Sequence, residues 1–148
     1  MNKLAKKLDL LNTISSDSPH KKYRMIVAKA DSAATHNYWR NEDMDCLSKI
    51  RDYNGPSVTL PNNTQISPKK QGLIPLSKEF SEDARTATNL PHLKSSSLLA
   101  TGPLCDDGKV VLFDREKVHV IQHNKQYDEL LHTSPIILDG SRNHFDGC

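Results

Sequence analysis

The sequence predicts an all-β domain. Apolar runs of strand length recur along the chain, clusters of Pro, Gly, Asn and Ser separate them, and little of the sequence has helical periodicity. The length of 148 residues suits one domain with short flanking segments. We expect an N-terminal helix and linker over residues 1–22, the β domain over residues 23–121, and a weakly ordered, truncated tail over residues 122–148.

Composition narrows the class of protein further. Hydrophobic residues make up 36%, so either part of the chain is disordered or a second copy completes the core. The net charge of +2 does not favour a nucleic-acid partner. An odd number of cysteines without a CxxC pair favours a reducing, intracellular and cytoplasmic setting over a disulfide framework. No apolar run has the length of a membrane span, and no pattern calls for a cofactor.

The N-terminal segment is predicted to form an amphipathic helix over residues 2–12. Leu4, Leu8 and Leu11 recur at helical spacing, and lysines occupy the other face. A helix this short favours a terminal surface position over a contact with a membrane or with RNA. The next segment, residues 15–20, has the composition of a linker.

The first convincing strand covers residues 23–29 and leads to Asp31, followed by Ser32 and two small residues. This pattern suits a carboxylate held in a tight loop with a hydroxyl beside it, and it is also ordinary turn chemistry. Residues 36–54 then form a polar stretch, with a helical turn or loop over residues 41–47. His36, Asp43, Asp45 and Cys46 lie in this stretch without a recognised ligand spacing, so no metal site is predicted.

Further short strands follow. Residues 57–66 carry a hairpin signal around Pro61-Asn62-Asn63, and Asp106-Asp107-Gly108 is interpreted as a turn between strands in preference to a pair of catalytic or cation-binding carboxylates. Residues 95–102 indicate a serine cap and one apolar turn closed by Gly102. The scattered His123, His132 and His144 are expected at the surface. The remaining strands are expected over residues 71–76, 85–91, 109–113, 118–121 and 135–138.

The order of these features resembles the protease segment of a copia-type LTR retrotransposon polyprotein. The resemblance covers residues 23–147, and its end, residues 140–147, is similar to the start of the segment that leads toward integrase. The resemblance depends on five matching segments that occur in the family's order, and this order makes it specific. The matching segments are Ala30-Asp31-Ser32-Ala33-Ala34-Thr35, Val58 to Ile66, Gly72 to Leu76, Leu90 to Leu99, and Leu104 to Gly108 with Val110 to Phe113.

The resemblance implies a retropepsin-like barrel that contributes one half-site per chain. Two copies would pair as a homodimer, and Asp31 of each would form a dyad that shares one proton and activates water against a peptide bond. Ser32, Ala33 and Ala34 would support the loop, and Leu98, Leu99 and Gly102 would pack behind it. The implied substrate is the element's own Gag-Pol-type polyprotein, cleaved in the cytoplasm or within retroelement particles. Residues 58–66 would supply the hairpin that covers the peptide.

The sequence departs from the family pattern at Ala33, which stands where the family has glycine. A methyl group there crowds the loop if the backbone needs a positive φ or a close approach. A second hypothesis therefore stays open, in which the chain is a decayed or co-opted fragment that dimerises or binds extended peptides without cleaving them. A third, weaker hypothesis is RNA contact through the N-terminal segment.

Overall fold

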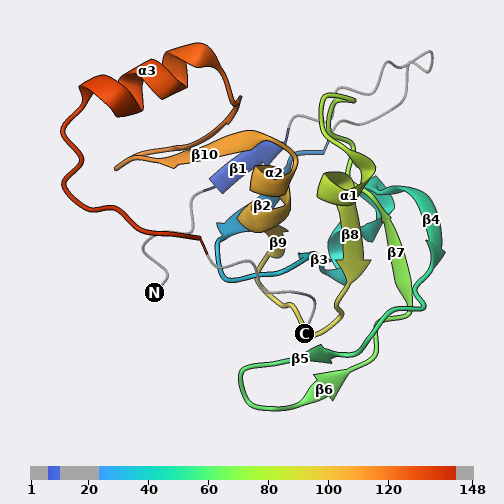
Figure 1. Cartoon of the computed structure of the whole chain (residues 1–148). Coiled ribbons are helices and arrows are strands. Elements are labelled where there is room, and N and C mark those ends of the chain that lie inside the picture. Colours follow the sequence, from blue (N-terminus) through green and yellow to red (C-terminus); the bar gives the residue numbers. More distant parts are fainter. Residues whose placement is uncertain (1–6, 11–23, 143–148) are drawn as a thin grey trace, which may run out of the picture.

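The computed structural model describes residues 7–10 and 24–142. Strands in mixed sheets dominate this part of the chain and helices are few and short, so the predicted all-β class is confirmed. The largest element is a seven-stranded sheet (Figure 1). Its strands are, in spatial order, β1 (Lys7–Leu10), β2 (Ile26–Asp31), β9 (Ser97–Ala100), β3 (Asn37–Trp39), β8 (Thr86–Asn89), β7 (Lys70–Leu73) and β4 (Ser48–Asp52).

Two hairpins and four short helices complete the described structure. The seven-stranded sheet does not close into a barrel over these residues, because β1 and β4 form its two edges. Among the same residues, no helix is both long and apolar enough to cross a bilayer. The remaining elements are the hairpin β5 (Val58–Thr59) and β6 (Gln65–Ile66), the hairpin β10 (Lys109–Phe113) and β11 (Val118–Gln122), the 3-10 helix η2 (Asn41–Cys46), and the helices α1 (Glu82–Arg85), α2 (Thr101–Asp106) and α3 (Lys125–Thr133).

Strand β2 lies second from the edge of the sheet and carries the core on one face. Ile26, Ala28 and Ala30 are buried, whereas the residues between them are half-buried, as alternation along a strand requires. β2 pairs antiparallel with β1 and parallel with β9. The core around this face contains the fully buried Trp39, together with Leu99 and Leu104 from β9 and α2. Burial of these side chains fixes which face of β2 is covered.

The hairpin predicted over residues 57–66 is present as β5–β6. Thr59 pairs with Gln65, and the turn is closed by the Leu60 amide, which donates to the Thr64 carbonyl over 2.8 Å. Asn63 has a φ of 64°, the left-handed conformation that asparagine tolerates in turns. The hairpin extends away from the seven-stranded sheet on the connection between β4 and β7 (Figure 1).

The predicted N-terminal helix is wrong where the structure describes it. Lys7–Leu10 is a strand that pairs with β2, with Lys7 opposite Lys29 and Leu10 opposite Ile26. The sequence over these four residues alternates between charged and leucine side chains, which suits a strand as well as a helix. An isolated helix of this length is marginal, whereas β2 offers a free edge that satisfies backbone groups. The rest of the predicted helix and the linker lie outside the described residues.

The structures predicted for residues 95–102 and for the turn at residues 106–108 also differ from those observed. The apolar residues before Gly102 form strand β9, and Gly102 lies inside helix α2 instead of ending a turn. Asp106 ends this helix, so the Asp107-Gly108 turn connects a helix to β10 and does not join two strands. Hydrogen bonding to β2 outweighs the local turn signal here, because β9 is paired along its whole length.

The remaining differences concern polar segments with weak periodicity. The stretch over residues 36–54 contains strands β3 and β4 besides the 3-10 helix η2, and neither strand is predicted from the sequence. Helix α3 is not predicted either, although Asn124 caps it by accepting from the Tyr127 amide over 2.9 Å. The strand predicted over residues 135–138 is absent, since these residues carry no strand or helix assignment. His144 lies outside the described residues.

Truncation of the core is expected to cost more than the same truncation at the surface. Leu104→Ala should lower the free energy of unfolding by about 2–5 kcal/mol, because Leu104 is only 1% exposed and its removal leaves a cavity. Urea unfolding measures the change. Leu130→Ala is the matched control, because Leu130 is 55% exposed and its removal should change stability by less than about 0.5 kcal/mol. Equal losses in the two variants would contradict the packing described here.

Candidate functional site

Asp31 is the last residue of β2 and begins a loop at the carboxyl end of that strand. In the sheet it pairs with Ala100, the last residue of β9. Its carboxylate Oδ1 accepts a hydrogen bond from the Ala33 amide over 2.8 Å. The side chain is half-buried, and Ser32 and Ala33 beside it are exposed. The loop therefore holds one acidic group in a defined orientation while leaving its outer side open.

The alanine at position 33 does not need the conformational freedom of glycine. Within the described residues, Lys49 and Asn63 are the residues other than glycine that have a positive φ. Ala33 therefore avoids the left-handed region, where a Cβ atom would cause strain. Ala34 is half-buried behind the loop. Alanine in place of glycine is expected to cause strain at a positive φ or to crowd a molecule that approaches the loop. The first effect does not arise here, so the second is the one that matters for function.

Leu98, Leu99 and Gly102 lie on the elements that adjoin this loop. Leu98 pairs with Lys29 of β2, and Leu99, only 2% exposed, packs into the core. Gly102 lies in α2, which begins directly after β9. The Arg142 guanidinium donates to the Gly102 carbonyl over 3.2 Å, and a Cβ atom on Gly102 would lie 3.3 Å from the same group. These residues thus support the strand next to Asp31 and the helix that follows it.

Asn37 connects the segments around the loop, although no sequence motif singles it out. Its side chain is 1% exposed and uses three hydrogen-bonding groups. Oδ1 accepts from the Ala100 amide over 2.8 Å, and Nδ2 donates to the carbonyls of Ala84 and Thr86, both over 2.9 Å. Since Ala100 pairs with Asp31, this one side chain fixes β3 and α1 relative to the candidate catalytic strand. A lone asparagine in a polar stretch carries no sequence signal for this position.

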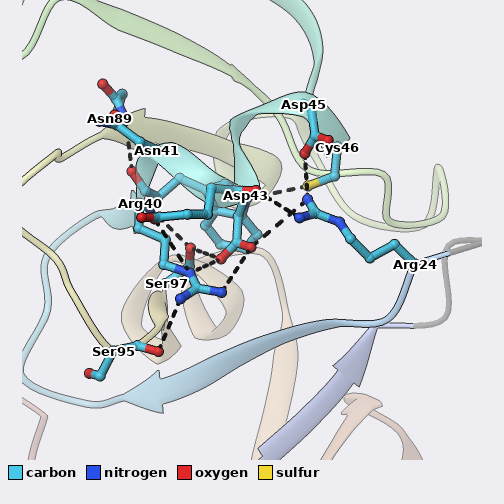
Figure 2. Close-up of polar contacts among 11 residues, drawn as sticks. Arg24, Arg40, Asn41, Asp43, Asp45, Cys46, Asn89, Ser95 and Ser97 are labelled. Carbon is cyan, nitrogen blue, oxygen red and sulfur yellow. Dashed lines mark hydrogen bonds and ion pairs between the residues drawn. The ribbon is translucent and has the colours of Figure 1, made fainter.

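Of the four residues considered as metal ligands, Asp43, Asp45 and Cys46 belong to η2, and His36 does not. Asp43 is buried and accepts from Arg40 Nε over 2.8 Å and from the Ser97 hydroxyl over 2.7 Å (Figure 2). Asp45 pairs with Arg24, whose guanidinium also lies 3.9 Å from the Asp43 carboxylate. Cys46 accepts from Trp39 Nε1 over 3.3 Å, and burial raises the pKa of its thiol. Asp43 and Cys46 therefore hold η2 against β9 and β3.

His36 lies apart from this cluster, and its ring Nδ1 is 3.0 Å from the Thr35 hydroxyl. Over residues 7–10 and 24–142, no group of three or more His, Cys, Asp or Glu side chains is arranged to hold a metal ion.

An open cleft of about 560 Å³ lies beside the candidate loop. Its lining includes Thr35 and His36, which continue the chain after Asp31, and Tyr53 and Pro56, which precede the β5–β6 hairpin. Asp31 itself is not among the lining residues. The other lining residues are Asn37, Arg51, Gly55, Gln71, Ser81, Asp83, Thr86, Thr88, Pro103, Asp106 and Asp107.

Asp107 borders the cleft and fixes the turn after α2. Its Oδ2 accepts from the Ser81 amide over 3.0 Å and from the Lys109 ammonium over 3.2 Å. These bonds, the one from the Ser81 backbone first, lower the pKa of Asp107 below its ordinary value. Lys109 also donates to the Glu79 carbonyl over 2.9 Å and lies 5.2 Å from the centre of the Phe80 ring. Asp107 is therefore a structural carboxylate, in agreement with its predicted place in a turn.

Comparison with known proteins identifies no relative. The chain gives no match to a protein-family model, to a curated protein or to a solved structure. The geometry around Asp31 and the ordered motifs of the sequence are therefore the basis for assigning a function.

Removal of the Asn37 side chain should destabilise the fold measurably. Asn37→Ala leaves the Ala100 amide and two carbonyls without their partner, and one unsatisfied buried group alone costs about 1–3 kcal/mol. Thermal and urea unfolding test this. Asn54→Ala is the matched control, because Asn54 is exposed and should tolerate the change. A stable Asn37→Ala protein would contradict the central place given to this side chain.

The lowered pKa of Asp107 predicts a pH dependence of stability. The ionised carboxylate stabilises the fold at pH values above about 4, the ordinary pKa of aspartate, and this stabilisation is lost as the pH falls through the lower pKa of the folded state. Asp107→Asn should therefore lower the unfolding free energy by about 1–2 kcal/mol at pH 7. The difference from the wild type should shrink toward pH 3. Urea unfolding at pH 7, 5 and 3 measures it, with Glu129→Gln as an exposed control.

Proposed function

We propose that this chain is one half of a homodimeric aspartic endopeptidase of the retropepsin type. The observation that carries the proposal is the position of Asp31, at the carboxyl end of β2 with its carboxylate oriented by the Ala33 amide. One such carboxylate cannot supply both the base and the acid that peptide hydrolysis needs. A second copy of the loop, related by a two-fold axis, would supply the other.

The chemistry follows from placing the two carboxylates close together. Two neighbouring carboxylates cannot both ionise easily, so the pair retains one proton. The ionised Asp31 would take a proton from water, whose oxygen attacks the peptide carbonyl carbon. The protonated Asp31 of the second copy would donate to the carbonyl oxygen, and the titration would belong to the pair. No metal or cofactor is needed for these steps.

The exposure of the loop supports its pairing with a second copy. Ser32 and Ala33 are exposed, and within the described structure the Ser32 hydroxyl makes no hydrogen bond. A free hydroxyl next to the carboxylate suits a contact between two loops. The negative φ of Ala33 supports this too, because the loop reaches its conformation without glycine. The remaining requirement is that the loop of the second copy packs against the Ala33 Cβ without a clash.

The cleft and the hairpin support a peptide as the substrate. Thr35 and His36 connect the loop to the cleft, and Tyr53 and Pro56 connect the cleft to the β5–β6 hairpin. A peptide bound across Asp31 in an extended conformation would place a side chain in this cleft. The ordered sequence motifs support the narrower proposal that the domain derives from a copia-type polyprotein, whose other segments would be its substrates.

A non-catalytic peptide-binding domain is the second candidate function. The specific observation in its favour is that Asp31 does not line the 560 Å³ cleft, so a peptide could occupy the cleft without reaching the carboxylate. Among the residues that the structure describes, β4 lies at an edge of the sheet, and this edge offers a place for strand addition. This function predicts peptide binding that Asp31→Asn leaves unchanged, with no cleavage products.

The protease function predicts that cleavage depends on Asp31. Asp31→Asn should reduce peptide cleavage by at least about a hundredfold, because it removes the ionisable group from both half-sites at once. A peptide library read by mass spectrometry, from acid to neutral pH, measures this. Asp128→Asn changes an exposed carboxylate in α3 and should leave cleavage unchanged. Equal cleavage by the wild type and Asp31→Asn would contradict the proposal.

A further inference from the structure

A row of polar side chains crosses three neighbouring strands of the large sheet and lines the 560 Å³ cleft. Arg51 of β4 is paired with Gln71 of β7, and Gln71 is paired with Thr88 of β8 (Figure 1). Residues directly opposite one another in antiparallel strands carry their side chains on the same face of the sheet. Since all three residues line the cleft, they form one polar row along it.

The row lies on the face of the sheet opposite the core. Ala87, which precedes Thr88 in β8, is fully buried in the core cluster, so alternation along the strand places Thr88 on the other face. Thr86, two positions before Thr88, lines the cleft too, as the same alternation requires. Thr88 is nevertheless only 5% exposed. A polar side chain buried to this extent normally has a hydrogen-bond partner inside the protein.

The donor groups of the row lack such partners. In the part of the chain that the structure describes, the side chains of Arg51, Gln71 and Thr88 make no hydrogen bond or ion pair. Among the same residues, every fully buried side-chain nitrogen or oxygen has a partner except Ser96 Oγ, so the Thr88 hydroxyl keeps some surface toward the cleft. The row therefore offers a guanidinium, an amide and a hydroxyl to a ligand that accepts hydrogen bonds.

The carboxylates that line the cleft leave the guanidinium of the row without a counter-ion. Asp106 is paired with Arg142 over 2.9 Å, and Asp107 is paired with Lys109 over 3.2 Å. Asp83 of α1 also lines the cleft, but it is exposed to solvent and forms no ion pair with the row. The unpaired positive charge and the row of donors therefore favour an anionic group.

We propose that the cleft recognises a carboxylate side chain, glutamate or aspartate, of the peptide that lies across Asp31. This inference rests on the proposed function and adds to it the class of side chain that the cleft selects. The planar guanidinium of Arg51 matches a carboxylate with two parallel hydrogen bonds, and the Gln71 amide and the Thr88 hydroxyl are further donors in the same row. Arg51 is then a specificity-determining residue that does not touch the bond to be cut.

The same groups disfavour the apolar side chains that a cleft of this size would otherwise accept. A leucine side chain in the cleft displaces water from the Thr88 hydroxyl and the Gln71 amide without accepting a hydrogen bond from either. A site built to hydrogen-bond its ligand rejects an analogue that lacks the acceptor far more strongly than an apolar pocket rejects a change of size. The preference for an acidic residue should therefore be marked.

Peptide selection with the Asp31→Asn chain tests this proposal without cleavage. The full-length chain is immobilised at neutral pH and incubated with a random peptide library, and the retained peptides are sequenced by mass spectrometry. Glutamate or aspartate should be enriched at least about tenfold at one position of the aligned peptides. Glutarate measures how far a free acid competes with an enriched peptide.

Variants made in the same Asp31→Asn chain assign the preference to the row. Arg51→Glu should reverse it, so that lysine or arginine is enriched at that position. Thr88→Val keeps the shape of the side chain and should weaken binding of an enriched peptide about tenfold, because it removes one hydrogen bond to a charged group. Arg115→Glu is the matched control, because Arg115 is exposed between β10 and β11 and lies outside the cleft lining. It should leave the preference unchanged.

The contrary outcomes separate this inference from the protease function. If the wild type cleaves library peptides but the retained peptides show no acidic preference, the inference fails and the protease function stands. Retention of the same acidic peptides by the Arg51→Glu variant also overturns it, and so does binding of glutarate as tight as that of the peptide, which would assign the site to a small free acid. If acidic peptides are retained through Arg51 but the wild type cleaves nothing, the protease function fails and the cleft's preference stands for the non-catalytic peptide-binding domain.

Discussion

The hydrogen bonds of the Asn37 side chain are the constraint on which the geometry of the candidate site depends. The segments around Asp31 come from distant parts of the sequence, and Ala84, Ala87 and Leu99 of these segments pack into one core. Asn37 joins three of these segments, because it binds the Ala100 amide and the carbonyls of Ala84 and Thr86. An amide side chain is suited to this position since it offers an acceptor and two donor hydrogens in one plane. The buried setting makes each of these bonds costly to lose.

The hydrogen bonds among Asp43, Arg40 and Ser97 hold the other end of β9 in place. Asp43 is 2% exposed, and the Arg40 guanidinium pairs with its carboxylate, so the buried charge is compensated as burial requires. The Ser97 hydroxyl donates to it and accepts from the Arg40 amide. β9 is thereby fixed at both ends, by Asp43 near Ser97 and by Asn37 at Ala100. The strand that pairs with Asp31 is thus held by polar contacts as well as by the packing of Leu99.

The sequence predicts those parts of the fold in which local pattern and tertiary pairing agree. β2, the β5–β6 hairpin and the β10–β11 strands alternate or carry turn residues, and each is present. The errors arise where pairing with a distant segment decides the structure. Lys7–Leu10 joins the free edge of β2 instead of forming a helix, and Ser97–Ala100 becomes a strand because β2 lies beside it.

In the candidate site too, local motifs are predictable from the sequence and contacts between distant residues are not. The short motif around Asp31 is enough to locate the candidate carboxylate and its loop from the sequence alone. Asn37, Asp43 and Ser97 instead support the site through contacts between distant residues, which lie 54 positions apart for Ser97 and Asp43 and 63 apart for Ala100 and Asn37. Such contacts leave no periodic signal, because a polar residue in a polar stretch is equally consistent with a surface loop.

In the proposed protease, one active site needs Asp31 from two chains. Mixing the wild type with an excess of the Asp31→Asn chain, followed by subunit exchange, tests this claim directly. If each site is shared, most wild-type chains will pair with a variant. With one wild-type chain in ten, the activity per wild-type chain should then fall to about a tenth. Activity per wild-type chain that stays constant at every mixing ratio would contradict a shared site.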